Sequence, residues 1–367
     1  MSGYAVKGPA PVRGTAPATE AEVVTLLRAG GPILVRGGGT QDALGAPLRA
    51  APVLCDTTGL RAAAMAHTPE DLTVTAPAGL RWAELQAALG RHGQWVPCDP
   101  PAAEGATVGG VVAGNAFGPW RQSQGSMRDL VIGLRAVAGT RTAFFAGARV
   151  AKNVAGFDLC KLLVGSCGTL AVLVECSFKV RPLPAARRTF ATRGDPAAAL
   201  AGPVPPAALA AWTDGRILVA YDGSERAVAA AGARLREMYA GVDEQPAAAW
   251  DEVRAHMRAG PLVVRASVPA GEAAAVARQL EMLGYAVLAC PGFGMLWGRH
   301  ADPSERVWQR AAAIARGAGG RALCAVAPDG LADPWDSDPT LLPLHRALKA
   351  RFDPEGVFAP GRFVGGI

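Results

Sequence analysis

The chain has 367 residues, of which 50% are hydrophobic and 19% are charged, and its formal net charge is +6. A chain of this size can bury a sizeable core and is expected to form about two or three domains. The basic residues are scattered, which argues against a nucleic-acid-binding surface. No apolar run is long enough to cross a membrane, and residues 1–15 lack the apolar stretch of a signal peptide. We therefore expect a soluble, cytoplasmic protein that binds no nucleic acid.

The cysteines and histidines do not form the patterns that bind metals. Seven cysteines are an odd number, and none belongs to a C-x-x-C pair, so we expect no disulfide framework, iron–sulfur cluster or zinc site. The histidines are isolated, and His300, near Arg299 and Asp302, is the most suggestive of them. A histidine on a surface turn is the favoured interpretation of His300. The histidines are His67, His92, His256, His300 and His345.

The first half of the chain alternates short apolar runs with glycine-rich turns. Apolar residues at helical spacing predict a helix at 20–29, ended by Gly30 and Gly31, and another at 82–89, closed by Gly90. Apolar alternation and short apolar runs predict strands around these helices. The expected strands are Ile33–Arg36, Val53–Asp56, Leu72–Thr75, Leu130–Val137 and Leu170–Val180.

The character of the sequence changes after Pro182 and Pro184. Strands then alternate with amphipathic helices in a β-α-β-β-α-β rhythm, which is typical of an antiparallel sheet with helices on one face, ferredoxin-like in outline. No internal sequence repeat stands out, and residues 344–363 are expected to form a short helix followed by turns. The expected strands are 217–221, 262–268, 285–290, 293–297 and 322–326, and the expected helices are 224–239, 271–283 and 303–316.

Two glycine-rich segments in the first half suit a phosphate-bearing ligand. Glycines 37–39 follow the apolar run 33–35, so their backbone amides can turn toward one anion without a Cβ atom in the way. A second glycine-rich segment, 106–115, offers another close backbone approach. The spacing is not the Rossmann fingerprint, because Asp42 stands where the third glycine would be. Two such loops favour a large dinucleotide such as FAD, and ordinary tight turns are the alternative.

Several motifs together resemble the vanillyl-alcohol-oxidase type, also called PCMH type, of FAD-binding domain. The motifs are Val35–Thr40, Ala106–Asn115, Gly125–Asp129 and Gly168–Val172. More narrowly, segment 150–162 and the tail 352–362 are similar to the FAD-binding subunits of bacterial glycolate oxidases. The resemblance implies an α+β fold with a two-part PCMH-type FAD-binding domain at 1–184. A ferredoxin-like antiparallel α+β cap domain at 185–340 would follow, and a C-terminal segment, 341–367, would pack back on the FAD domain.

The same resemblance implies which residues contact the cofactor. The first loop would bind the pyrophosphate, and the second loop would flank the ribityl chain and the flavin. Lys152 and Asn153 are expected near the flavin ring, with a solvated loop as the alternative, and core packing is the alternative for Val172. The expected FAD-binding residues are Arg36, Gly37, Gly38, Gly39, Thr40, Pro100, Thr107, Gly109, Gly110, Asn115, Lys152, Asn153, Gly168, Thr169 and Val172. No catalytic residue and no metal ligand is assigned.

Two departures from related flavoproteins shape the expected chemistry. Thr40 stands where relatives with covalent flavin usually carry histidine, and residues 114–121 contain no cysteine, so the FAD should be non-covalent. The cap region has no His-rich metal motif, and its arginines Arg265, Arg299 and Arg306 lie on separate expected elements. The substrate machinery of related hydroxy-acid dehydrogenases is therefore expected to be incomplete.

The resemblance implies an FAD-dependent oxidoreductase that acts on CH–OH groups within a multisubunit complex. The expected role is the FAD-binding subunit of a glycolate oxidase, which oxidises glycolate to glyoxylate, and this subunit would transfer electrons without a complete substrate site. Its partners would be a larger flavin subunit and an iron–sulfur subunit, with membrane contact only through them. A self-sufficient FAD-dependent oxidase of another small 2-hydroxy acid, or a non-catalytic structural flavin-binding subunit, remain the alternatives.

Overall fold

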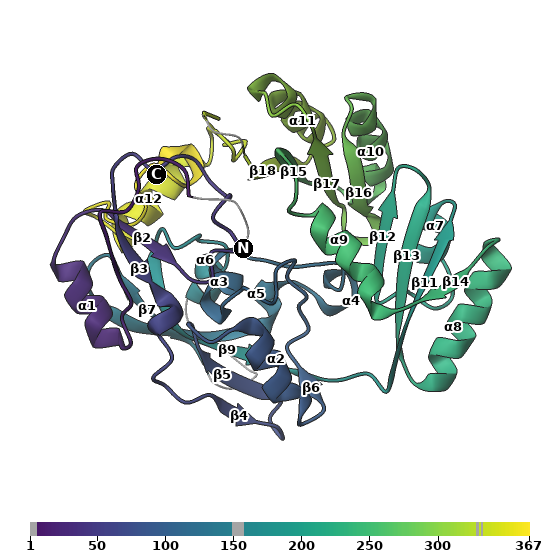
Figure 1. Ribbon diagram of the computed structural model, residues 1–367, viewed down its shortest axis with the longest axis horizontal. Coiled ribbons are helices and arrows are strands. Elements are labelled where there is room, and N and C mark those ends of the chain that lie inside the picture. Colours follow the sequence, from purple (N-terminus) through teal and green to yellow (C-terminus); the bar gives the residue numbers. More distant parts are fainter. Residues whose placement is uncertain (1–5, 149–157, 328–329, 332) are drawn as a thin grey trace. The chain divides into compact units, whose positions relative to one another are not determined.

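A computed structural model describes residues 6–148, 158–327, 330–331 and 333–367 (Figure 1). The chain folds into two compact units. The first unit comprises Met1–Phe117, Ser126–Leu183 and Ser337–Ile367, and the second comprises Gly118–Gly125 and Pro184–Asp336. The second unit therefore takes a short segment from the middle of the first half of the chain, which a single division after residue 184 does not anticipate.

The first unit contains two main sheets and one short strand pair. Strands in the order β1-β3-β2 form a parallel sheet: β1 (Arg13–Thr15), β2 (Ile33–Arg36) and β3 (Val53–Asp56). Strands in the order β4-β5-β9-β7-β8 form an antiparallel sheet: β4 (Ala66–Thr68), β5 (Thr73–Pro77), β7 (Val131–Ala138), β8 (Ala143–Gly147) and β9 (Ala171–Lys179). The strand pair joins β6 (Gln94–Trp95) and β10 (Arg181–Pro182).

The helices of the first unit are mostly short. They are α1 (Glu20–Arg28), α2 (Trp82–Gly90), α3 (Val108–Ala113), α5 (Met127–Leu130), α6 (Leu159–Leu163) and α12 (Leu342–Phe352). Helix α1 begins at 20 because the Thr19 side chain accepts the amide N–H of Glu22. Its apolar face packs with Ile33 of β2, Val172 of β9 and Phe358 of the C-terminal segment in one buried core. This core joins the two sheets.

The C-terminal segment is built into the first unit by backbone hydrogen bonds. Ile33 donates its amide N–H to the carbonyl of Val357 (2.7 Å) and accepts that of Ala359 (2.8 Å), so the segment extends the small sheet beside β2. Lys349 of α12 also holds the segment in place. Its Nζ lies 2.7 Å from the Asp353 carboxylate and donates to the carbonyls of Thr169 (2.8 Å) and Phe358 (2.9 Å).

Lys349 and Asp353 form a buried ion pair. The Asp353 side chain is fully buried and also accepts the amides of Val357 and Phe358. Burial lowers the pKa of Lys349 below the ordinary lysine value, and the hydrogen bond to Asp353 opposes that shift. The pair therefore joins the C-terminal segment to the turn at Thr169, which is 180 positions away in the chain.

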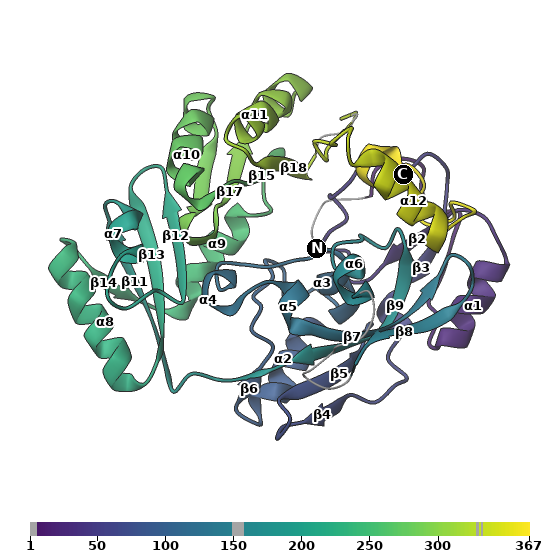
Figure 2. The ribbon, with the colours of Figure 1, turned by 180° about the vertical axis from the view of Figure 1, so that it is seen from behind.

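The second unit contains one antiparallel sheet, in which a β-α-β-β-α-β pattern occurs twice in succession (Figure 2). The first contains β11 (Ala186–Arg193), α7 (Pro196–Leu200), β12 (Ala208–Trp212), β13 (Arg216–Gly223), α8 (Glu225–Met238) and β14 (Asp243–Gln245). The second contains β15 (Leu262–Ser267), α10 (Ala273–Met282), β16 (Ala286–Cys290), β17 (Met295–His300), α11 (Glu305–Gly317) and β18 (Arg321–Val326). Each has the same internal strand order, and the two are joined where β12 pairs with β16.

Both faces of this sheet carry helices. Ala211 of β12 and Ala289 of β16 are register partners, and they belong to the cores under α8 and under α10 with α11. These helices therefore share one face. Successive side chains of a strand point to opposite faces of the sheet. On β11, Phe190 packs in the core under α8, so its neighbour Thr189 lies on the other face. Helix α9 (Trp250–His256) covers that other face, because the Trp250 indole donates to the Thr189 hydroxyl (3.0 Å).

The segment 118–125, with α4 (Arg121–Gln124), belongs to this second unit through its side chains. The Trp120 indole donates to Asp222 (3.3 Å), and its ring packs edge-on against Trp250 at 4.8 Å between centroids. Arg187 lies over the Trp120 ring, 4.6 Å from its centroid, and pairs with Asp222. Trp120 is 4% exposed, so this small segment is an integral part of the unit's core.

The α+β fold class is confirmed, and the helices expected at 20–29, 82–89, 224–239, 271–283 and 303–316 are found within a few residues of their predicted ends. Four elements of the first ferredoxin-like pattern were not expected from the sequence, so its second occurrence along the chain was not anticipated: β11, α7, β12 and β14. Alanines and prolines before β12 hide its alternation. Among the described residues, no helix combines the length and the apolar character that crossing a bilayer requires.

Replacing Lys349 by Met should lower the free energy of unfolding by about 3–5 kcal/mol, because Asp353 would remain buried without its counter-charge. Urea unfolding followed by circular dichroism measures the change. Lys161→Met is the matched control, since Lys161 is 57% exposed in a surface pair with Asp158 and should change stability by less than about 0.5 kcal/mol. Equal effects of the two variants would contradict a structural role for the buried pair.

Candidate functional site

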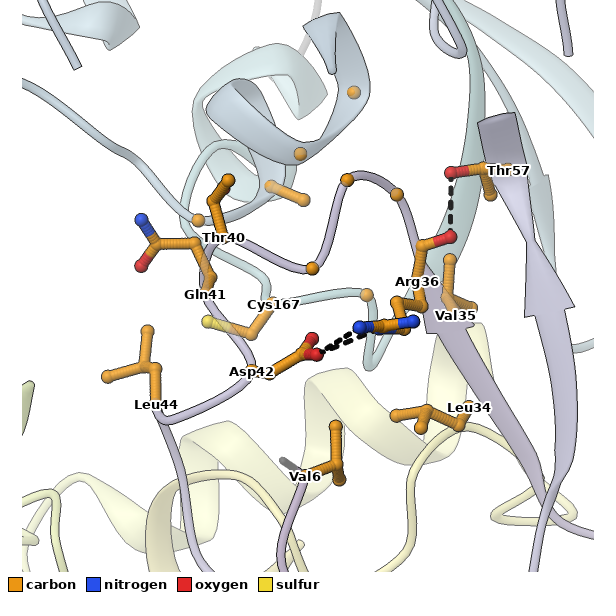
Figure 3. A pocket seen from close by; sticks show the side chains of 18 of the residues that line it. Val6, Leu34, Val35, Arg36, Thr40, Gln41, Asp42, Leu44, Thr57 and Cys167 are labelled. Carbon is orange, nitrogen blue, oxygen red and sulfur yellow. Dashed lines mark hydrogen bonds and ion pairs between the residues drawn. The ribbon is translucent and has the colours of Figure 1, made fainter. Parts of the chain in front are cut away.

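A pocket in the first unit lies where the two glycine-rich loops meet (Figure 3). The empty space between its walls, open solvent included, is about 760 Å³. The end of β2 and the loop after it form one wall, and α3 forms another. The turn at 167–168, the start of β9 and Arg362 of the C-terminal segment complete the lining.

The two loops touch through their backbones. A Cβ atom on Gly38 would overlap the carbonyl oxygen of Gly105, and one on Gly37 would overlap the Thr107 hydroxyl. Gly39 has a φ of 72°, which residues other than glycine rarely adopt. The three glycines are therefore required by close packing and by backbone conformation, independently of any ligand.

The first loop has backbone donors that the protein does not use. Within the part of the chain that the structure describes, the amides of Gly38, Gly39 and Thr40 donate no hydrogen bond. Backbone amides that are withdrawn from water are normally paired, and successive unpaired amides form a concavity that binds anions. The loop is thus equipped to receive an anionic group.

Arg36 and Asp42 close the base of this loop. The Arg36 guanidinium lies 2.6 Å from the Asp42 carboxylate, which is 7% exposed, and Figure 3 shows the pair facing each other across the loop. The hydrogen bond to Asp42 raises the pKa of Arg36 above its ordinary value. The Thr57 hydroxyl donates to the Arg36 carbonyl (3.2 Å), which fixes the end of β2. The charge of Arg36 is therefore largely balanced within the protein.

The turn before β9 is held on α3 by backbone hydrogen bonds. Gly165 and Cys167 donate their amides to the carbonyls of Val112 (3.1 Å) and Ala113 (2.8 Å). Three residues of this turn have positive φ: Gly165 (88°), Cys167 (53°) and Gly168 (69°). Cys167 is a non-glycine residue in this strained region, and such residues concentrate at functional sites. All seven cysteines lie in the described part of the chain and none forms a disulfide.

Eight of the expected FAD-binding residues line the pocket together: Arg36, Gly37, Gly38, Gly39, Thr40, Gly109, Gly110 and Gly168. Others lie behind its walls. Thr107 is buried and accepts the amide of Gly110 as the N-cap of α3, and Thr169 is buried and donates to the Ser166 carbonyl. Val172 lies in the core beside α1, and Asn115 follows α3 with a φ of 45°.

Two groups of expected residues are not placed in this pocket. Pro100 lines a separate hollow of the first unit together with Trp82 and Cys98. Lys152 and Asn153 lie outside the described residues. The sequence analysis also left out several residues that do line the pocket: Val6, Leu34, Val35, Gln41, Asp42, Leu44, Thr57, Ala113, Gly114, Cys167, Ala171, Leu173 and Arg362. Asp42 could have been found as an acidic partner for Arg36, but Arg362 is too distant in sequence.

Two of the three arginines that were expected on separate elements of the second unit lie close together in the sheet. In the register of β15 and β17, Arg265 is opposite Trp297 and Val263 is opposite Arg299. Arg265 and Arg299 are therefore diagonal neighbours on one sheet face, although their elements are separate in sequence. Arg306 lies on α11 instead. The described residues contain no group of three or more His, Cys, Asp or Glu side chains that could hold a metal ion.

Three of the histidines have contacts within their own unit. His300 accepts the amide of Asp302 (2.9 Å), and its other ring nitrogen lies 3.1 Å from the Leu283 carbonyl. The rings of His67 and His92 pack against each other in the first unit, with their centroids 4.9 Å apart, although the two residues are distant in sequence. His67 also hydrogen-bonds the side chain of Gln94 (2.7 Å).

Comparisons with known proteins are consistent with this geometry. Residues 14–143, which contain the first loop and α3, match the FAD binding domain family. The structure is similar to that of alkyldihydroxyacetonephosphate synthase, with a TM-score of 0.69 and 16% sequence identity over 95% of this chain and 75% of that one. At this identity the likeness shows the shared fold.

A curated relative is similar over nearly the whole chain. The glycolate oxidase subunit GlcE of Escherichia coli (strain K12) is 32% identical over 345 residues, which cover 90% of this chain and 92% of that protein. The mitochondrial D-lactate dehydrogenase [cytochrome] of Arabidopsis thaliana is 33% identical over 46% of this chain and 30% of its own length. The glycolate oxidase subunit GlcD of Bacillus subtilis (strain 168) is 36% identical over 33% of this chain and 26% of its own length.

The long match to GlcE, the FAD binding domain and the shared fold agree with one another. The chain therefore belongs to the GlcE family of glycolate oxidase subunits, FAD-linked oxidoreductases with a PCMH-type FAD-binding domain.

Proposed function

We propose that this chain binds one non-covalent FAD in the pocket of the first unit and serves as the FAD-binding subunit of a glycolate oxidase complex. The observation that supports this most is the run of three unused amides, Gly38–Thr40, in a pocket formed by both glycine loops. These amides would hold the diphosphate of the cofactor. The complex would oxidise glycolate to glyoxylate.

The residues around the pocket fit such a cofactor. Besides the amides, the Asn115 Oδ1 and Ser166 Oγ atoms are buried without a hydrogen-bond partner among the described residues. Both flank α3 and the turn bound to it, where the ribityl chain and the flavin are expected, and buried polar atoms of this kind call for a partner. Gly109 and Gly110 line the pocket from α3, and a Cβ atom on Gly109 would overlap Ala78.

The assignment of domains follows from the same proposal. The first unit would form the FAD-binding domain, and the second unit, which includes Gly118–Gly125, would form the cap. Val172 and Thr169 would then act by supporting the wall of the pocket, whereas Lys152 and Asn153 are retained as candidates for contact near the flavin ring. Pro100 is retained on the resemblance alone.

The chemistry would come from the cofactor, which when bound accepts a hydride from a carbon that bears a hydroxyl group. This chain would contribute position, exclusion of water and a polar surrounding. Oxidation of a small 2-hydroxy acid also needs a positioned cation for the carboxylate and a base for the hydroxyl proton. We propose that a larger flavin subunit supplies these groups and that an iron–sulfur subunit accepts the electrons.

Gly38→Val should abolish FAD binding, because its side chain would overlap Gly105 and displace the unused amides. Losing even one charge-assisted hydrogen bond weakens affinity roughly tenfold or more. Flavin content per protein after purification, with a titration of FAD fluorescence, measures the effect. Gly90→Ala is the control, since a Cβ atom there meets nothing within 4 Å. Full occupancy of the Gly38 variant would show that the loop is only a turn.

The FAD is expected to be non-covalent, since Thr40 offers no imidazole nitrogen and no Cys lies in 114–121. Precipitation of the protein with acid should leave the flavin in the supernatant. In-gel fluorescence after denaturing electrophoresis provides the second measurement. A fluorescent protein band would contradict the expectation.

The isolated, FAD-loaded chain is expected to react with glycolate slowly or not at all, because the residues that hold a 2-hydroxy acid would come from a partner. Anaerobic mixing with millimolar glycolate and recording of flavin absorbance test this. Recovery of activity on addition of the partner subunits would support the subunit role. Rapid bleaching by the chain alone would favour a self-sufficient oxidase, with Arg265 and Arg299 as the first residues to replace.

A further inference from the structure

Most of the polar side chains that line the pocket bond to other parts of the protein. Arg36 and Asp42 pair at 2.6 Å, and Thr57 donates to the Arg36 carbonyl (3.2 Å). Arg362 donates to the Asp42 carbonyl (2.8 Å), and the Cys167 thiol donates to a carbonyl of its own turn. In the described part of the lining, two polar side chains differ in having no hydrogen bond to the protein: Thr40 and Gln41.

Gln41 is the one of these two that no sequence motif assigned to the cofactor. It is half-buried, and its stem packs against the second loop, because a Cβ atom on Gly114 would lie 3.1 Å from the Gln41 Cγ atom. Figure 3 shows the Gln41 amide pointing away from the Arg36–Asp42 pair. The second loop therefore positions the stem of Gln41, and the amide at its end is left for a ligand.

The chemistry of this amide points to hydroxyl groups. A glutamine side chain has two N–H donors and one carbonyl acceptor and carries no net charge. Hydroxyl groups donate and accept, so they can use both ends of the amide, whereas ionised phosphate oxygens only accept. Gln41 directly follows the unused amides of residues 38–40, so its side chain reaches the part of the ligand next to the diphosphate. In FAD those parts are the ribityl chain and the adenosine ribose, which both carry hydroxyl groups.

We propose that the Gln41 amide binds the hydroxyl groups of the ribityl chain and so gives the pocket its preference for the flavin half of the cofactor. The contact with Gly114 places Gln41 at the end of α3, the wall along which the proposed function has the ribityl chain. The amides of residues 38–40 bind the diphosphate, which does not distinguish one nucleotide from another. This inference rests on the proposed function, because it requires FAD in this pocket.

The test divides FAD into FMN and ADP, each of which keeps phosphate for the first loop. Binding of FAD, FMN and ADP to the full-length protein after removal of FAD is measured by calorimetry, with competition against FAD for the weaker ligands. Gln41→Met keeps an unbranched stem against Gly114 and removes the amide. We expect FAD and FMN to bind roughly 5- to 50-fold more weakly and ADP affinity to be unchanged.

Gln279→Met is the matched control. Gln279 is exposed on α10 of the second unit, so the same substitution there should leave the affinities for all three ligands unchanged. Gln41→Ala removes the stem together with the amide, and its comparison with Gln41→Met separates packing from hydrogen bonding. Gln41→Ala also carries the comparison of FMN with ADP if Gln41→Met does not fold, which circular dichroism checks.

The outcomes discriminate between explanations. Unchanged FAD and FMN affinities in a folded Gln41→Met would overturn the inference, and a loss confined to Gln41→Ala would show that the stem of Gln41 only packs against the second loop. A loss of ADP affinity as large as the loss of FMN affinity would assign Gln41 to the phosphates or the adenosine, and it would overturn the inference as well. Failure of the unmodified protein to bind FAD, FMN or ADP would instead overturn the proposed function.

Discussion

The backbone contact between two loops is the constraint on which the pocket depends. Because Gly37 and Gly38 have no Cβ atoms, the loop after β2 lies directly against Thr107 and Gly105. Thr107 begins α3, and α3 holds the following turn through two backbone hydrogen bonds. Lys349 then fixes the far side of that turn at Thr169. The walls are thus positioned mainly by main-chain contacts, which leaves the remaining amides available for a ligand.

Local patterns were sufficient for the parts of this fold that local interactions determine. The helix expected at 20–29 forms because a threonine cap, apolar spacing and two glycines act within one short segment. The glycine loops could also be found, because close approach and positive φ select glycine at particular positions. The eight expected residues that meet in one pocket come from these motifs.

Contacts between distant segments could not be derived in this way. Arg362 is 320 positions from the Asp42 carbonyl that it holds, and no spacing rule connects them. Arg265 and Arg299 become neighbours only once the register of β15 and β17 is known. The first of the two ferredoxin-like patterns was hidden because its strand β12 consists largely of alanine, whose small side chains give little alternation.

The segment 118–125 has a practical consequence for dissecting this protein. Its Trp120 is enclosed by Trp250, Arg187 and Asp222, so the second unit contains a piece of chain that sequence order would assign to the first. A fragment that starts near residue 184 would expose the Trp250 ring and lose an indole from its interior. Independent expression of the two units therefore requires a circularly permuted or two-piece design in which this short segment is supplied to the second unit.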